Sequence, residues 1–273
     1  MAARWLTSLL MALMFAQAVL GLLLPDQYKD AEWIRVTWYG NDWITILGSV
    51  PLLWIGIRMA ARGSVRGLLL TLGMVAYGVY NYAFYLFGAA LNVFFPLYVV
   101  IVVVSIVTLG LVLSKLDIDA VANCFHRATP VRAVGGYLIF VAIGLTIVWL
   151  GMWGAYAFAG RPTPIEPEAF KIVAALDLSL MVPALATGGA LLWRQQRWGY
   201  LIATIAAIQG AMYLLVLSVN SVIAISHGLA TTPGELPFWG PLASFTTLAA
   251  LVLLRSASGR LATSQPPNIS GKW

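Results

Sequence analysis

Eight long apolar segments, with short polar segments between them, constrain the fold of this chain more than any other feature. The hydrocarbon core of a membrane is about 30 Å thick, so a helix needs about 20 residues to cross it. Each apolar segment has or approaches that length, and only 10% of the residues are charged. The pattern predicts an all-α, polytopic transmembrane helical bundle whose eight spans cover residues 5–24, 43–60, 67–87, 94–114, 133–159, 170–193, 199–226 and 239–254.

The charges of the polar segments predict how the bundle lies in its membrane. Lys and Arg gather on the side that holds the N-terminus, where they include Arg62, Arg66 and Arg194. The opposite side is acidic and includes Glu166 and Glu235. Because basic residues beside spans favour the cytoplasmic side, we expect both termini to be cytoplasmic. The protein would then be a multi-pass protein of a cell membrane, such as the bacterial inner membrane.

The net charge of +6 is mostly a consequence of this topology. The basic residues are spread over several segments and form no dense run, so nucleic acid is not an expected partner. The single cysteine, Cys124, excludes an internal disulfide. The partners that we expect are membrane lipids, a small-molecule ligand, a second copy of the chain or a subunit of a membrane complex.

The first span also fits a second interpretation. Arg4 precedes an apolar stretch that reaches Ala16-Gln17-Ala18, a pattern typical of a signal-peptide cleavage site. The apolar residues continue as far as Leu24, however, which makes the segment long enough to span. We therefore predict a single transmembrane domain over residues 1–260, followed by a short polar cytoplasmic tail over residues 261–273.

The domain divides into two possible repeat halves of four spans each, residues 1–132 and 133–260. The second and sixth spans resemble each other, since each runs from an aspartate to an arginine over the same separation: Asp42 to Arg62 and Asp177 to Arg197. The alternative is that spans of this direction commonly have an acid at the outer end and an arginine at the inner end.

Polar side chains inside the apolar segments indicate where a function is located, because burying them in a membrane costs free energy. Asp177 lies in the outer half of the sixth span. One face of the third span and one face of the seventh also carry polar groups, and Asp42 lies at the outer end of the second span. The candidate ligand-binding residues are therefore Asp177, Asn81, Tyr80, Tyr77, Gln209, Tyr213, Asn220 and Asp42.

Several chemistries do not fit these residues. The two histidines, His126 and His227, lie in an inner loop and at an outer helix end, so a zinc site or intramembrane haem ligation is not expected. No phosphate-binding glycine loop occurs. We expect no metal and no cofactor.

Three functions remain. The first is a protein that binds or transports a small apolar or amphipathic solute, or a lipid, through an outward-facing cavity lined by aromatic side chains. The second is a structural or accessory subunit of a membrane complex, in which the polar stripes only join helices. The third is an intramembrane enzyme that acts on a lipid-borne substrate with Asp42 and Asp177 as acid and base.

Overall fold

The computed structural model describes residues 2–260 and is all-α over that range. Eight of its helices are long and apolar enough to cross a membrane, which confirms the prediction of a multi-pass helical protein. They are Ala2–Leu23, Glu32–Ala60, Val65–Gly88, Phe95–Leu113, Val131–Ala159, Pro167–Trp193, Arg197–Ser226 and Leu236–Ser256. The predicted tail, residues 261–273, lies outside the described residues.

Six spans are single helices; between spans, residues 2–260 also contain the 3-10 turn Pro25–Gln27 and one short α-helix. The spans are α1 (Ala2–Leu23), α4 (Val65–Gly88), α5 (Phe95–Leu113), α7 (Val131–Ala159), α10 (Arg197–Ser226) and α11 (Leu236–Ser256). The short helix is α6 (Ile118–Asn123), and it follows α5.

The second and sixth spans are interrupted helices of the same kind. In the second, α2 (Glu32–Ile44) and α3 (Val50–Ala60) are joined by the π-helical turn Thr45–Ser49; in the sixth, α8 (Pro167–Leu176) and α9 (Val182–Trp193) are joined by Asp177–Met181. Pro51 and Pro183 lie two residues after the last residue of each π turn. A proline has no N–H and its ring crowds the carbonyl one turn earlier, which here lies inside the π turn, so each proline accounts for the local change in hydrogen bonding.

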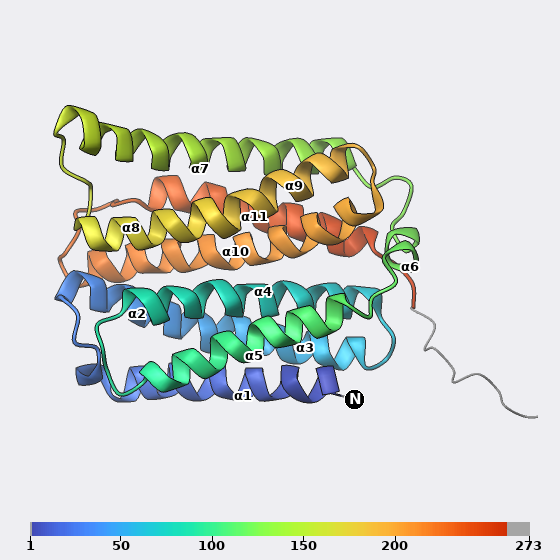
Figure 1. Cartoon of the computed structure of the whole chain (residues 1–273), viewed down its shortest axis with the longest axis horizontal. Helices are drawn as coiled ribbons and strands as arrows, with labels where there is room; N and C mark the ends of the chain where they lie inside the picture. The colour runs from blue at the N-terminus through green and yellow to red at the C-terminus, as the bar shows by residue number, and fades with distance from the viewer. Residues whose placement is uncertain (1, 261–273) are drawn as a thin grey trace, which may run out of the picture.

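The helices form two groups, α1–α5 and α7–α11, that meet where α10 packs on α4 and α2 (Figure 1). In the most apolar part of α4, 78% of the residues are buried, against 61% for α10 and at most 33% for the other spans. These two helices therefore form the core. At the edges, α1 lies outermost in one group, and α7 lies outermost in the other, where it packs on α9 (Figure 1).

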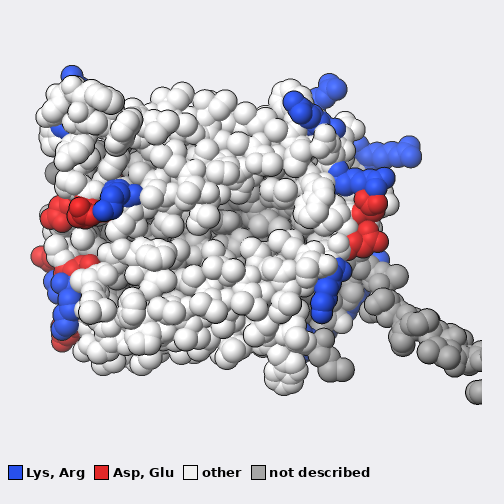
Figure 2. Space-filling view, viewed as in Figure 1, with Lys and Arg blue, Asp and Glu red and all other residues white. Residues whose placement is uncertain are grey.

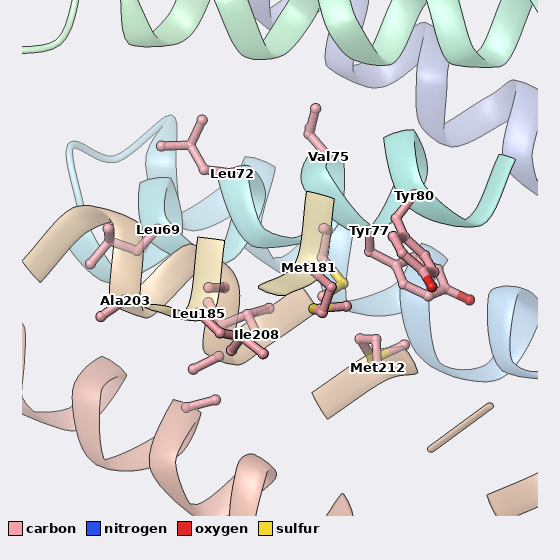
Figure 3. Close-up of a cluster of buried hydrophobic side chains, with 14 of the residues drawn as sticks. Leu69, Leu72, Val75, Tyr77, Tyr80, Met181, Leu185, Ala203, Ile208 and Met212 are labelled. Carbon is pink, nitrogen blue, oxygen red and sulfur yellow. The ribbon is translucent and has the colours of Figure 1, made fainter. Parts of the chain in front are cut away.

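The centre of the bundle is a tightly packed apolar contact between the groups. Figure 3 shows Leu72 and Val75 of α4, Met181 and Leu185 of the sixth span, and Ile208 of α10 as parts of one apolar cluster. A Cβ atom at Gly73 of α4 would approach Ile208 Cγ2 to 2.5 Å, so the glycine provides the space that this isoleucine fills.

Charged side chains gather at the two ends of the bundle, and the band between them is free of charge in the face shown in Figure 2. The beginning of α1 and the last described residues lie at the same end, which carries mostly Lys and Arg in this view (Figures 1 and 2). A neutral band between charged ends is the surface expected of a membrane-spanning bundle.

The second span begins earlier than predicted, because α2 starts at Glu32 and not near Trp43. The intervening residues are too polar to resemble a span, but two of their polar side chains, Trp38 and Asp42, have hydrogen-bond partners within the bundle. Asp30, before the helix, accepts hydrogen bonds from Trp38 Nε1 at 2.9 Å and from the Ala90 N–H at 2.8 Å. Hydropathy therefore misses the first part of this span, which is stabilised by hydrogen bonds to other parts of the bundle.

Candidate functional site

Asp177 lies at the start of the π turn in the sixth span and is completely buried. Its Oδ1 accepts a hydrogen bond from the Tyr80 hydroxyl at 2.5 Å. Its Oδ2 accepts hydrogen bonds from Trp149 Nε1 at 2.8 Å and from the Tyr213 hydroxyl at 3.4 Å. Three aromatic side chains thus surround one carboxyl group, and we call these four residues the Asp177 cluster.

The Asp177 cluster joins the two groups of helices. Tyr80 comes from α4 in the first group, whereas Trp149 and Tyr213 come from α7 and α10 in the second. The rings of Tyr80 and Tyr213 also meet edge to face, with their centroids 5.0 Å apart. Asp177 is about ten residues, or about 15 Å, from the start of its span, so this junction is deep within the bundle.

No cation among residues 2–260 pairs with the carboxyl group of Asp177. The two ion pairs found within residues 2–260 are Lys171 with Glu168 and Arg197 with Asp119, all exposed residues. A carboxyl group within a membrane span costs free energy even when it is hydrogen-bonded, and such groups mark ion, proton or substrate pathways more often than simple packing contacts. No group of three His, Cys, Asp or Glu residues suited to a metal occurs in this part of the chain.

Asp42 is the centre of a second buried cluster. Its Oδ2 accepts a hydrogen bond from the Tyr28 hydroxyl at 2.6 Å, and its Oδ1 accepts bonds from the Tyr85 hydroxyl at 2.8 Å and from Gln17 Nε2 at 3.3 Å. Gln17 Nε2 also lies 3.1 Å from the Tyr28 hydroxyl oxygen. These four residues, the Asp42 cluster, belong to α1, α2, α4 and the segment after α1, so they connect helices of the first group only.

Aromatic rings pack closely around the Asp42 cluster. Tyr85 stacks between Trp38 and Tyr98, with centroid distances of 4.7 and 5.1 Å. Phe94 meets Tyr28 at 6.0 Å. The sequence predicted that aromatic side chains of the outer half line an open cavity. Here these rings fill the space themselves, because flat rings that stack leave little room between helices.

Among the described residues, the carboxyl groups of Asp42 and Asp177 share no hydrogen-bond partner. Both are bound from α4, but Tyr80 and Tyr85 are five residues apart and therefore point about 140° apart around that helix. Each is also enclosed by its own aromatic side chains. An acid and a base that act on one substrate must both reach it, so this arrangement offers no support for joint catalysis by Asp42 and Asp177.

The structure brings Tyr80 and Tyr213 onto Asp177, whereas the other predicted residues form no hydrogen bond with it. Asp42 belongs to its own cluster, and Asn220 lies against Gly40 of α2. Within residues 2–260, the Tyr77 hydroxyl, Asn81 Nδ2 and Asn220 Oδ1 are buried without a hydrogen-bond partner. Gln209, one turn before Tyr213 on α10, is also buried. Buried polar atoms of this kind usually bind water or a ligand.

A small hollow lies beside Tyr213, between α7, α9, α10 and α11. Its volume is about 20 Å³, enough for about one water molecule. Its walls are mostly aliphatic and come from Tyr137, Leu138, Val141, Leu145, Met181, Leu185, Gly210, Tyr213, Leu214, Leu242 and Thr246. A solute larger than water therefore needs the helices around Asp177 to separate before it can enter this hollow.

Sequence reasoning missed Trp149, Tyr28, Tyr85 and Gln17 as partners of the two carboxyl groups. Gln17 carried a usable signal, since it is a lone amide in an apolar segment, but it was interpreted as part of a cleavage motif. Trp149 carried no signal, because a tryptophan in an apolar run is ordinary.

Comparison with protein-family models, with curated proteins and with solved structures finds no match to this chain.

Proposed function

We propose that this protein binds or transports a small apolar or amphipathic solute across a cell membrane, and that Asp177 is the charged or proton-linked group of its site. The observation that carries the proposal is the position of Asp177. It is a buried carboxyl group without a cationic partner, and it is hydrogen-bonded by side chains from both groups of helices. Tyr80, Tyr213, Tyr77, Asn81, Gln209 and Asn220 supply polar contacts, and Asp42 stabilises the first group.

The same hydrogen bonds give a means of coupling. A solute reaches Asp177 only when the groups of helices move apart, and this movement breaks the bond from Tyr80 while those from Trp149 and Tyr213 remain within the second group. The partners of Asp177 therefore differ between closed and open states, which is the condition for a ligand or proton to shift the equilibrium between them. The π turn and Pro183 beside it are local irregularities of the kind found at functional positions in helices.

We further propose that residues 1–132 and 133–260 are structural repeats. Pro51 and Pro183 are 132 residues apart, as are Gly56 and Gly188, and the π turns Thr45–Ser49 and Asp177–Met181 have the same separation. Helix packing agrees, since α3 and α5 pack on α4 as α9 and α11 pack on α10. Repeats with an even number of spans are related by an axis along the membrane normal.

This register differs from the one that the sequence suggested. It places Thr45, and not Asp42, at the position of Asp177, so the two clusters are not equivalent. In this register the second half has a carboxyl group at the aligned position, Asp177, whereas the first half has the hydroxyl group of Thr45. Both ends of the chain are proposed to be cytoplasmic, since the start of α1 and the last described residues lie at the arginine-rich end of the bundle.

A thermal-shift screen followed by transport assays tests this function. Purified full-length protein in detergent is incubated with a panel of amphipathic amines, carboxylates and neutral aromatic solutes, since a ligand that binds the native state raises Tm. Solutes that raise Tm are then assayed in proteoliposomes that contain a pH-sensitive dye. We expect Asp177→Asn to abolish the Tm shift, or the proton movement that accompanies uptake.

The matched control is Glu168→Gln, which removes an exposed carboxylate from the same span. It should leave both measurements unchanged. If Asp177→Asn folds and still binds and transports every effective solute with the same dependence on pH, Asp177 does not have the proposed role.

An accessory subunit is the second candidate, and the outer face of α7 favours it. Three glycines of this helix, Gly144, Gly151 and Gly154, have open space where a Cβ would lie. Exposed glycines let another helix approach closely. Purification in mild detergent tests this function, because a defined partner should then co-purify and Gly151→Leu should release it.

A further inference from the structure

At the arginine-rich end of the bundle, a hollow lies between the turn that joins α3 to α4 and the segment that follows α11. Its volume is about 330 Å³, within the range of small-molecule sites. It is far along the helices from the Asp177 cluster and independent of the function proposed for it. Its lining residues are Met59, Arg62, Ser64, Arg66, Ser258, Gly259 and Arg260.

Backbone and side-chain hydrogen bonds shape this hollow. Ser64 and Arg260 form an isolated antiparallel bridge, which brings the end of α11 against the start of α4. Arg66 Nε donates a hydrogen bond to the Ala257 carbonyl oxygen at 2.6 Å, and Nη2 donates one to that of Arg255 at 2.9 Å. These bonds fix the Arg66 guanidinium, which has five N–H donors in all and so retains several for another partner.

Three guanidinium groups line one hollow without a carboxylate among its lining residues. Arg62, Arg66 and Arg260 take no part in the ion pairs formed within residues 2–260. Like charges gathered in this way repel one another, and a bound anion offsets that repulsion. A guanidinium presents paired N–H groups that match the oxygens of phosphate, which makes arginine the preferred residue for phosphate recognition.

We propose that this hollow binds the phosphate group of an anionic phospholipid. A lipid is the favoured source because the hollow lies at the ends of two spans, at the depth of lipid headgroups, and has Met59 as an apolar wall. On the same helix, Arg58 lies over the exposed ring of Trp54 at 5.2 Å, an anchor typical of the membrane interface. Basic pockets at helix ends on the cytoplasmic side hold anionic headgroups in this way.

Lipid titration of the full-length protein in neutral detergent tests the proposal. Short-chain phosphatidylglycerol and phosphatidylcholine are added separately, and the Kd of each is obtained from the rise in Tm. We expect phosphatidylglycerol to bind at least tenfold more tightly. The double variant Arg62→Gln/Arg260→Gln should weaken its binding about tenfold or more, whereas Arg127→Gln/Arg194→Gln, which removes two exposed arginines outside the hollow, should not.

Two further experiments distinguish a lipid phosphate from a soluble phosphate and identify an effect that arises only from a folding defect. Glycerol 3-phosphate and inorganic phosphate are titrated in the same way; if either binds as tightly as phosphatidylglycerol, the ligand is a soluble phosphate and the lipid proposal is wrong. If the double variant has a lower Tm than the native protein in the absence of lipid, Arg62→Lys/Arg260→Lys is used instead. This variant should lose less affinity for phosphatidylglycerol than the glutamine variant. Equal binding of both lipids, or equal effects of the hollow and control variants, would overturn the site.

Discussion

The Tyr80 hydroxyl donates a hydrogen bond to Asp177 Oδ1 across 2.5 Å and thereby connects α4 of the first group of helices to the π turn of the second. The residues are 97 positions apart in the chain. Within the second group, Trp149 and Tyr213 hold the same carboxyl group. The bond from Tyr80 is therefore the one that a separation of the two groups must break.

Replacing Tyr80 by phenylalanine should weaken the association of the two groups. The change keeps the ring and removes one donor from a buried carboxyl group, so we expect a loss of about 1 to 2 kcal/mol in the free energy of unfolding. Thermal or denaturant unfolding in detergent measures it. Tyr200→Phe is the control, since the hydroxyl of Tyr200 makes no hydrogen bond to the described residues; equal losses in both variants would show that the bond to Asp177 contributes little.

Gly21→Ala should disrupt the Asp42 cluster. A Cβ atom at this position would collide with Asp42 Oδ2 and with the Tyr28 hydroxyl, so the cluster must shift. Overpacking of this kind costs about 1 to 3 kcal/mol. Gly110→Ala in α5 has open space around its Cβ and should be neutral or slightly stabilising. The prediction is wrong if the two variants have similar unfolding midpoints.

The proposed repeat predicts matched effects for Gly56→Ala and Gly188→Ala. A Cβ at Gly56 would lie 3.0 Å from the backbone nitrogen of Thr71, and one at Gly188 would lie 2.8 Å from that of Ala203. Because these partners are also 132 residues apart, each substitution should cost about 1 to 3 kcal/mol. Unfolding of the two variants should be compared with Gly144→Ala, which has free space; a cost confined to one half would argue against equivalent packing.

Cys124 should react slowly with iodoacetamide near neutral pH. It follows α6, outside the spans, and burial raises the pKa of its thiol above the usual value. Because the thiolate is the reactive form, its alkylation rate should rise with pH over a higher range than that of an exposed cysteine. Ser114→Cys in a Cys124→Ser background provides the exposed reference. A Cys124 profile at or below the reference would contradict the effect of burial.

Labelling of single cysteines should establish the topology. In the Cys124→Ser background, Thr232→Cys, in the exposed segment between α10 and α11, should react with an impermeant maleimide in intact cells. Ser114→Cys, at the arginine-rich end, should react only after permeabilisation. Labelling of Ser114→Cys in intact cells would place that end outside and reverse the proposed orientation.

The sequence by itself determined the eight spans and the charge at their ends. A long apolar run predicts a span, and the arginines beside it predict its direction. Both effects depend on the membrane as solvent and not on contacts between helices. It also identified Asp177, Tyr80 and Tyr213 as residues of interest, because polar groups in an apolar run are visible without a fold.

Only the tertiary structure decided which of these groups meet. Helical periodicity places Tyr80 and Tyr85 on different faces of α4. The packing of α4 against its own group and against α10 determines that Tyr80 faces Asp177 and Tyr85 faces Asp42. The helix from Glu32 likewise depends on distant partners such as Ala90. The sequence paired Asp42 with Asp177 by equal spacing. In the repeat that we propose, the π turns and the close glycine contacts pair Thr45 with Asp177 instead, because contacts between backbones set the register of packed helices.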